Sequence, residues 1–280
     1  MDHGIPLNVF FFAWTLGVPA LFVILVFGFR ALGWWPEKAR KGSRRSDIMS
    51  FQIVAGACLA YMGTVGFLVW FRLHPEWDIT PLELDRFHGH ADFVETHLLL
   101  PMLAYQLWQV VACFIFADLF DYSMIGHHTV TFGLAYVCLR PCLQYYVCFY
   151  FGLAEITNIP LTIIDTMKYF PELGEQFPAL KTGCKQSFAI LFFIIRIFYW
   201  TYVTAIMLSI VYPKLWDPTT ESPPVIAFFL FAAAFLTGLQ WLWGFKIYHL
   251  VVNDEANNQR HKDQRDKEKE QNLRESAKTK

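Results

Sequence analysis

The stretch that decides the fold is HHTVTFGLAYVCLRPCLQYYVCFYFGLAEITN, residues 127–158. It contains two apolar runs, and the CLRPC segment at 138–142 marks a break between them. An apolar helix of about 20 residues crosses a bilayer, and a helix pairs its own backbone polar groups in lipid. The stretch therefore predicts two membrane helices, with His127 and His128 at the start of the first and Glu155 inside the second.

The rest of the 280-residue chain extends this pattern. Hydrophobic residues make up 55% of it and aromatic residues 18%, and the mean hydropathy is positive. The net charge of −1 does not discriminate between classes of protein. The chain predicts an all-α polytopic membrane bundle of about seven transmembrane helices. Its apolar blocks are Leu7–Phe29, Phe51–Phe71, His97–Ala117, His127–Leu139, Cys142–Met167, Phe188–Val211 and Val225–Val251. The fourth block is long enough only if its helix begins near Tyr122.

Lysine and arginine set the expected orientation, because they concentrate in cytoplasmic loops. With seven helices, loop 30–47, loops 118–126 and 168–187, and the C-terminal tail lie on one side, and basic residues favour this side. We therefore expect the basic loop 30–47 and the tail to be cytosolic and the N-terminus to be lumenal.

Three regions follow from this division. Residues 1–49 form the first transmembrane helix and the basic cytosolic loop, and residues 50–252 form the main membrane domain. Residues 253–280 are polar and of mixed charge, so this tail is expected to be disordered or a solvated single helix. No nucleic-acid signature is present, and no nucleic-acid partner is expected.

Charged residues inside apolar blocks are costly and usually face a bundle interior or a cavity. Glu155 lies near the middle of the fifth block, Asp165 nearer its end, and Arg196 lies in the sixth block. Either Glu155 and Arg196 pair and lock two helices together, or they line a cavity.

The two adjacent histidines also allow two interpretations, a functional pair or a polar anchor at the membrane interface. Neighbouring helical residues point about 100° apart, so His127 and His128 cannot face one ligand equally. Asp118 and Asp121 precede them, and on a continuous helix Asp121 would share a face with His128. A carboxylate beside an imidazole raises its basicity, as in general bases, whereas a lone interfacial histidine is a polar anchor.

A second histidine group occurs in RFHGHADFVETH, residues 86–97. Membrane di-iron enzymes use H-x-x-x-H or H-x-x-H-H boxes, and the spacing of His88, His90 and His97 differs. The expected orientation also places this group at the membrane face opposite His127. We therefore expect no metal site and no bound cofactor.

The residues of 127–158 resemble the signature of the TLC family, which includes ceramide synthases and translocating-chain-associated membrane proteins. In its synthases two histidines are followed at this spacing by D-x-x-D; here Glu155 and Asn158 stand at those positions. FFIIRIFYW, residues 192–200, resembles the family's next span. The resemblance covers roughly residues 50–250. It implies a TLC-type helical barrel around a lipid-sized pocket, and it implies the endoplasmic reticulum as the location.

Three functions remain open, and the sequence does not decide whether the chain is an enzyme. The first is binding, sensing or regulation of membrane lipids, acyl chains or sphingolipids, with Asp118, Asp121, Asn158 and Arg196 as polar groups of the pocket. The second is a ceramide-synthase-type acyltransferase with acyl-CoA as co-substrate and His127, His128 and Glu155 as catalytic residues. The third is a structural or chaperone-like membrane protein. Homo-oligomers and other membrane proteins remain open as partners.

Overall fold

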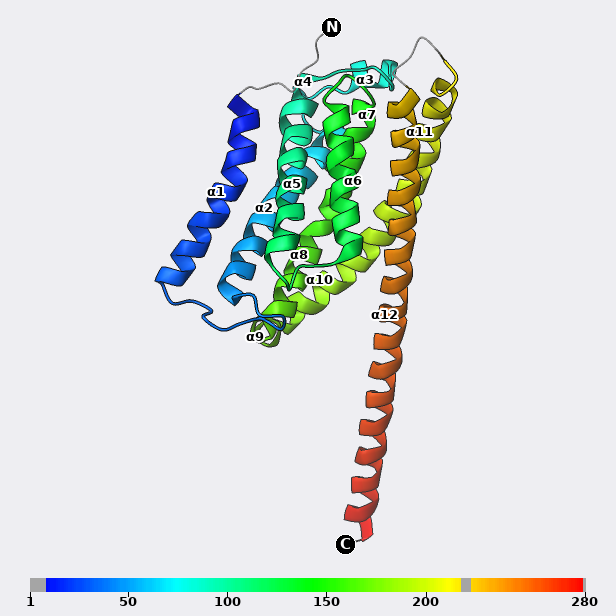
Figure 1. Cartoon of the computed structure of the whole chain (residues 1–280). Helices are drawn as coiled ribbons and strands as arrows, with labels where there is room; N and C mark the ends of the chain where they lie inside the picture. The colour runs from blue at the N-terminus through cyan, green and yellow to red at the C-terminus, as the bar shows by residue number, and fades with distance from the viewer. Residues whose placement is uncertain (1–8, 218–222, 279–280) are drawn as a thin grey trace.

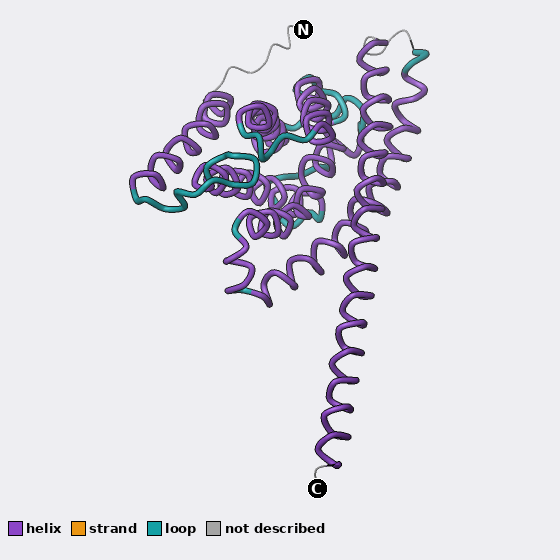
Figure 2. Tube along the Cα trace, turned by 60° about the horizontal axis from the view of Figure 1, so that its bottom comes forward, coloured by secondary structure: helices purple, strands orange, loops and turns teal. Residues whose placement is uncertain are grey.

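The apolar blocks of the sequence form long helices that pack side by side (Figure 1). The computed structural model describes residues 9–217 and 223–278, with side-chain environments for 9–217 and 223–253. Within these ranges the chain consists of helices and short connecting loops without a strand (Figure 2), which confirms the predicted all-α bundle.

Most of the apolar blocks form helices long enough to cross a membrane. By length and composition, six segments of the described chain qualify: Val9–Ala31, Arg45–Trp70, Asp92–Ile115, Gln144–Tyr169, Pro178–Lys214 and Pro223–Asn253. The short fourth block forms α6, Tyr122–Cys138, with 17 residues. Its helix begins at Tyr122, as a crossing requires, and it runs beside α5, Leu100–Ile115, along the height of the bundle (Figure 1). The predicted set of about seven therefore consists of six helices that meet the length criterion and the shorter α6.

Several of these segments are not regular α-helices throughout. The segment Asp92–Ile115 combines α4, a π-helical turn η1 and α5. The segment Gln144–Tyr169 combines α7, the π-helical turn η2, the 3-10 turn η3 and α8. The segment Pro178–Lys214 combines α10, the π-helical segment η4 and α11. The elements are α1 Val9–Ala31, α2 Arg45–Trp70, α3 Thr80–Leu84, α4 Asp92–Val94, η1 Glu95–Leu99, α5 Leu100–Ile115, α6 Tyr122–Cys138, α7 Gln144–Val147, η2 Cys148–Gly152, η3 Leu153–Thr157, α8 Asn158–Tyr169, α9 Pro171–Gln176, α10 Pro178–Leu191, η4 Phe192–Tyr199, α11 Trp200–Lys214 and α12 Pro223–Lys278.

Helix α2 packs against α1, α5, α8 and the irregular segment η2–η3. Two glycines allow the closest of these approaches. A Cβ atom on Gly66 of α2 would lie 2.1 Å from the Cα of Gly152, and one on Gly63 would lie 2.8 Å from the backbone N of Ile156. Because neither glycine carries a side chain, the backbone of α2 lies directly against the segment that bears Glu155.

The loops at one end of the bundle are joined by hydrogen bonds. The Asp118 carboxylate accepts hydrogen bonds from the backbone N–H groups of Lys41 (2.8 Å) and Ser43 (3.0 Å). Arg45 Nε donates to the carbonyl of Tyr169 (3.2 Å), whose hydroxyl donates to the carbonyl of Asp118 (3.1 Å). The basic loop, the turn before α6 and the end of α8 therefore lie at the same end.

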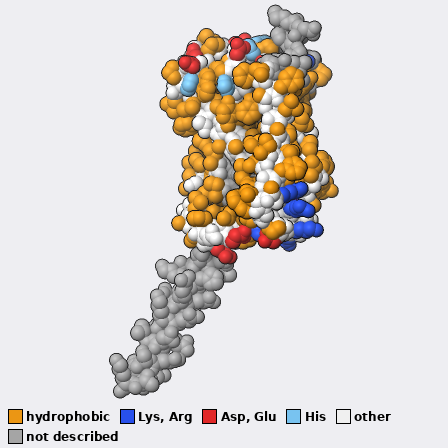
Figure 3. Space-filling model, turned by 90° about the vertical axis from the view of Figure 1, so that its left-hand side faces the viewer, with side chains coloured by type: hydrophobic (Ala, Val, Ile, Leu, Met, Phe, Trp, Pro, Cys, Tyr) orange, Lys and Arg blue, Asp and Glu red, His pale blue; other side chains and the backbone are white. Residues whose placement is uncertain are grey.

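The surface has the layout of a protein that crosses a membrane. On the face shown in Figure 3, a broad hydrophobic belt separates two polar ends. Lysine and arginine gather toward one end, whereas histidine appears with acidic residues at the other. Helix α12 continues from its apolar part through the charged tail to Lys278 and extends beyond the bundle (Figure 1).

Candidate functional site

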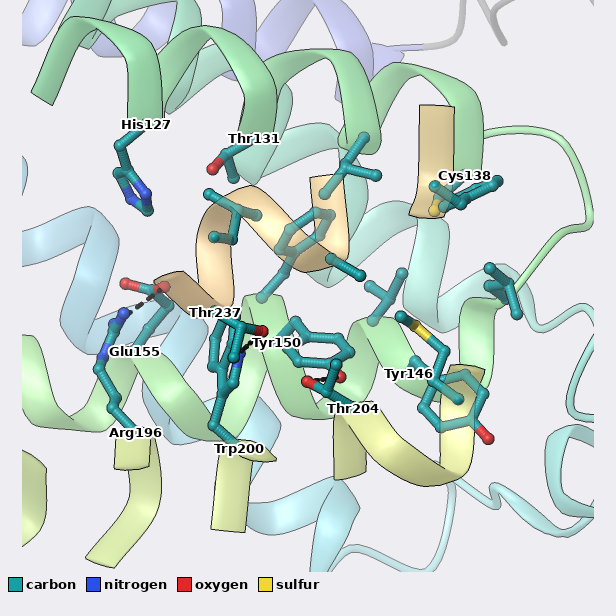
Figure 4. A pocket seen from close by; sticks show the side chains of 18 residues that line it. His127, Thr131, Cys138, Tyr146, Tyr150, Glu155, Arg196, Trp200, Thr204 and Thr237 are labelled. Atoms are coloured by element: carbon teal, nitrogen blue, oxygen red, sulfur yellow. Dashed lines mark hydrogen bonds and ion pairs between the residues drawn. The ribbon is translucent and has the colours of Figure 1, made fainter. Parts of the chain in front are cut away.

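A cavity lies between α6, the 143–155 segment, η4 with α11, and α12 (Figure 4). Its volume is about 50 Å³. Its walls are predominantly apolar, and the polar or amphipathic side chains that line it are His127, Thr131, Tyr146, Tyr150, Glu155, Arg196, Trp200, Thr204 and Thr237. The cavity extends along α6 from His127 to Cys138, a rise of about 16 Å for a helix.

The two charged residues and the histidine that line this cavity lie at one end of it. His127, Glu155 and Arg196 lie together there, whereas Cys138 and Tyr146 lie at the other end (Figure 4). The cavity therefore combines a long apolar wall with a localised polar end.

Glu155 and Arg196 form a buried ion pair at this end. Arg196 Nη2 lies 3.3 Å from Glu155 Oε1, and the two side chains are 5% and 10% exposed. Arg196 Nε also donates to Thr157 Oγ1 at 2.7 Å, and the Asn158 amide donates to Glu155 Oε2 at 2.5 Å. The two interpretations of these charges are therefore both correct, since the pair joins two segments and also lines the cavity.

Both charged residues lie in segments that depart from α-helical geometry. Glu155 is in the 3-10 turn η3, directly after the π-helical turn η2, and Arg196 is in the π-helical segment η4. Pro160 near the start of α8 has no N–H and cannot donate to the carbonyl one turn before it, which favours irregular geometry at this point. Such π-helical insertions occur frequently at functional sites because they change the direction of individual side chains.

The two adjacent histidines have different environments, as their helical spacing requires. His127 lines the cavity, and its ring lies against Trp243 with the centroids 5.4 Å apart. His127 Nδ1 is buried and has no hydrogen-bond partner among the described residues. His128 does not line the cavity; its Nδ1 lies 2.5 Å from Gln106 Oε1 and connects α6 to α5.

The two aspartates before the histidines lie outside the cavity. Asp121 caps α6 by accepting hydrogen bonds from the N–H groups of Ser123 (2.8 Å) and Met124 (3.1 Å). Asp118 lies in the preceding turn and binds the basic loop. The condition for a helix face shared by Asp121 and His128, a continuous helix, is not met, because α6 begins only at Tyr122 and the chain before it is not helical.

Several groups of the cavity were not expected from the sequence. Thr131, Leu134 and Cys138 follow His127 at helical spacing on α6, which is the one signal that could have identified them. Tyr150 and Thr204 share a 2.8 Å hydrogen bond, and the indole of Trp200 donates to Thr237 at 3.0 Å. Asn158, in contrast, reaches the polar end through Glu155 and does not line the cavity itself.

The second histidine group does not converge on one point. His97 Nδ1 lies 2.7 Å from the hydroxyl of Tyr61, and His90 Nε2 lies 3.0 Å from Asp92 Oδ1. His88 pairs with Asp85 at 3.6 Å. Within the described residues, no group of three or more His, Cys, Asp or Glu side chains is placed to hold a metal ion.

Comparison with protein-family models matches the TLC domain to residues 50–249, well over half of the chain. No curated protein and no solved structure matches the chain. The matched range contains the two histidines of α6, the buried Glu155–Arg196 pair and all of the cavity walls. The chain therefore belongs to the TLC-domain family and is a multi-pass membrane protein of that family.

Proposed function

We propose that this protein binds the acyl chain of a membrane lipid or sphingolipid in the cavity and thereby senses or regulates lipids. The observation that carries the proposal is the shape of the site: an apolar wall of about 16 Å that ends at buried polar groups. A ligand pocket requires this combination, because apolar surface supplies binding energy and a few polar groups fix orientation.

The cavity is too small to hold a whole acyl chain without a change in its walls. A volume of about 50 Å³ accommodates a few water-sized groups and not a whole acyl chain. Lipid entry therefore requires side chains in the wall to move. Met207 is suited to this, because its unbranched side chain is flexible and fills irregular spaces.

The family membership and the basic loop support a location and an orientation. We place the protein in the endoplasmic reticulum membrane with loop 30–47 and the C-terminal tail in the cytosol and the N-terminus in the lumen. Because α6 starts at the basic-loop end, His127 in its second turn then lies on the cytosolic side of the membrane. A lipid head group would enter from that side.

A pair of neighbouring alanines on α12 provides a test. Ala233 is buried and lines the cavity, whereas Ala234 is exposed on the outer face of the same helix. Full-length protein purified in mild detergent should retain lipid that mass spectrometry detects. Ala233→Phe should remove this lipid by filling the space, and Ala234→Phe should not. Equal lipid content in both variants and the wild type would contradict binding in this cavity.

The second candidate function is acyl transfer from acyl-CoA to a long-chain amine or alcohol. One observation favours it: the unpaired Nδ1 of His127 lies in the cavity, and the ring points toward Glu155 (Figure 4). His127 would act as base or transient acyl acceptor, with Glu155 as its orienting group. However, both Glu155 oxygens already accept hydrogen bonds from Arg196 and Asn158, so lipid binding is the better-supported function.

Acyl transfer has its own test. Membranes that contain the protein receive labelled acyl-CoA and a sphingoid base, with His127→Ala at equal expression as control. Product formed by the wild type alone would establish an enzyme. Absence of product at several chain lengths, together with retained lipid in the alanine experiment, would leave lipid binding as the function. If no lipid is retained and no acyl-transfer product forms, both candidate functions are contradicted and the structural or chaperone-like function is the one that is left.

A further inference from the structure

The basic loop between α1 and α2 contains a turn with a defined backbone. Residues 38–44, the basic turn, are closed by an antiparallel β-bridge between Lys38 and Arg44. Within the turn, the N–H of Ala39 donates to the carbonyl of Ser43 at 2.7 Å. The backbone of this loop is therefore fixed by its own hydrogen bonds.

The bundle also holds the basic turn from outside. The Asp118 carboxylate accepts hydrogen bonds from two of its backbone N–H groups. Before the turn, the ring of Trp35 packs edge-on against Phe170 with the centroids 5.3 Å apart. After the turn, the Arg45 guanidinium pairs with the Glu172 carboxylate. The basic turn is therefore fixed to the bundle and is more than a tether between two helices.

This fixed backbone brings like charges together. Four exposed cations lie on the turn, and among the residues with described side chains no carboxylate is within ion-pair distance of them: Lys38, Arg40, Lys41 and Arg44. The β-bridge places Lys38 opposite Arg44, and like charges directly opposite each other are destabilising. The orientation rule accounts for basic residues in a cytosolic loop, but not for a backbone that holds them against one another. The arrangement therefore indicates an anionic partner outside the chain.

Apolar side chains beside the basic turn place it at the depth of lipid head groups. Leu32 and Trp34, between the end of α1 and the turn, are 63% and 51% exposed. Tryptophan is enriched at membrane–water interfaces, where its ring lies at head-group level. Figure 3 shows lysine and arginine side chains gathered at the edge of the hydrophobic belt. A lipid head group is therefore the anion that already lies beside the turn.

We propose that the basic turn binds the head groups of anionic phospholipids, with Arg40 and Arg44 as the principal contacts. A guanidinium presents a planar fork of donors that matches two phosphate oxygens. Lys41 is less available, because its Nζ donates to the carbonyl of Phe120 at 3.5 Å. The orientation proposed above puts the turn at the cytosolic leaflet, whose anionic lipids attract basic segments. This surface is separate from the cavity, and its role does not depend on lipid binding there.

The binding experiment measures which lipids full-length protein retains in mild detergent. The protein receives an equimolar mixture of phosphatidylserine and phosphatidylcholine with identical acyl chains, and mass spectrometry quantifies the lipids that remain after repurification. We expect the wild type to retain phosphatidylserine about tenfold over phosphatidylcholine. A basic residue beside an anionic surface changes affinity about fivefold, so Arg40→Gln with Arg44→Gln should bring the ratio close to one. Both arginines are exposed, so this variant should melt like the wild type.

Two control variants separate the basic turn from net charge. Lys168→Gln with Lys181→Gln removes two cations at the same end but outside the turn, and should leave the lipid ratio nearly unchanged. Asp118→Ala makes this end more positive by one charge but removes the carboxylate that holds the turn. Attraction by charge alone then predicts a larger ratio. Loss of the fixed turn predicts a ratio reduced about threefold, because the side chains must be ordered on binding.

Four results would overturn the proposal or one of its parts. Equal retention of the two lipids by the wild type contradicts binding of anionic head groups. An equal fall in the arginine and lysine double variants shows that any cation at this end attracts lipid, and the basic turn is then not a site. An unchanged or larger ratio with Asp118→Ala overturns the role of the fixed backbone. Displacement of the bound phosphatidylserine by an excess of glycerophosphoserine, which has no acyl chains, shows a site for soluble anions and not for a lipid surface.

Discussion

Replacement of Arg196 by Met removes one partner of the buried ion pair and should strongly destabilise the bundle. At the 3.3 Å separation of Arg196 Nη2 and Glu155 Oε1, an effective dielectric constant of about 20 gives an attraction of about 5 kcal/mol. The substitution also removes the hydrogen bond to Thr157 and leaves the Glu155 carboxylate buried with only the Asn158 amide. Truncation of one partner of a buried pair typically costs about 3 to 5 kcal/mol, so we expect Arg196→Met to lose about that much stability.

Thermal unfolding of the detergent-purified protein measures this loss. A change of this size lowers the melting temperature by roughly 10 °C in a chain of this length. The double variant Glu155→Gln with Arg196→Met should recover most of the loss, because it removes both charges. Arg72→Met is the control: Arg72 pairs with Glu83, but the two side chains are 57% and 29% exposed, so its loss should leave the melting temperature almost unchanged.

Two results would contradict this account of the stability loss. If Arg196→Met melts within about 2 °C of the wild type, the pair does not join the two segments in the membrane domain. If the double variant is no more stable than the single variant, the unpaired carboxylate is not the cause of the loss.

Two further substitutions test the backbone contact and the helix cap. Gly66→Ala should prevent stable folding, because its Cβ would lie 2.1 Å from the Cα of Gly152, whereas Gly17→Ala, with nothing within 4 Å, should be neutral or slightly stabilising by the same melting assay. Asp121→Ala should cost about 1 kcal/mol at neutral pH through loss of the α6 cap. A hydrogen bond from the Ser123 side chain lowers the pKa of Asp121 below its usual value, with backbone hydrogen bonds assisting and partial burial opposing. A lowered folded-state pKa gives stability that is fully present well above the unfolded-state pKa of about 3.8. This stability falls below pH 3.8 and is lost as the pH passes through the lowered folded-state pKa, where the wild type and Asp121→Ala should converge. A difference that persists undiminished in acid would contradict this cause.

The apolar blocks and the placement of charge could be predicted because they depend only on composition along the chain. Lipid provides no partners for backbone groups, so long apolar runs must form helices, and the structure confirms this. The need for α6 to begin near Tyr122 followed from length alone, and it does begin there. The burial of Glu155 and Arg196 followed from the cost of charge in an apolar segment.

The partners of the polar residues could not be predicted in the same way. Asp118 and Asp121 were expected at the pocket, but one binds the basic loop and the other caps a helix. Local capping hydrogen bonds compete with a continuous helix, and the sequence does not show which prevails. The full burial of Gln240 could not be predicted, because a single amide in an apolar run carries no periodic signal.

By itself, the sequence determined that this chain forms a membrane bundle of helices, which segments are long and apolar enough to cross, and which charges are forced into its interior. The tertiary structure alone decided that His127 faces the cavity while His128 bonds to Gln106, and that Glu155 meets Arg196. For Glu155 and Arg196 the physical reason is the π-helical and 3-10 turns at 148–157 and 192–199, which change side-chain directions away from regular periodicity. Their geometry depends on packing between distant segments, such as Gly66 against Gly152, which no local pattern encodes.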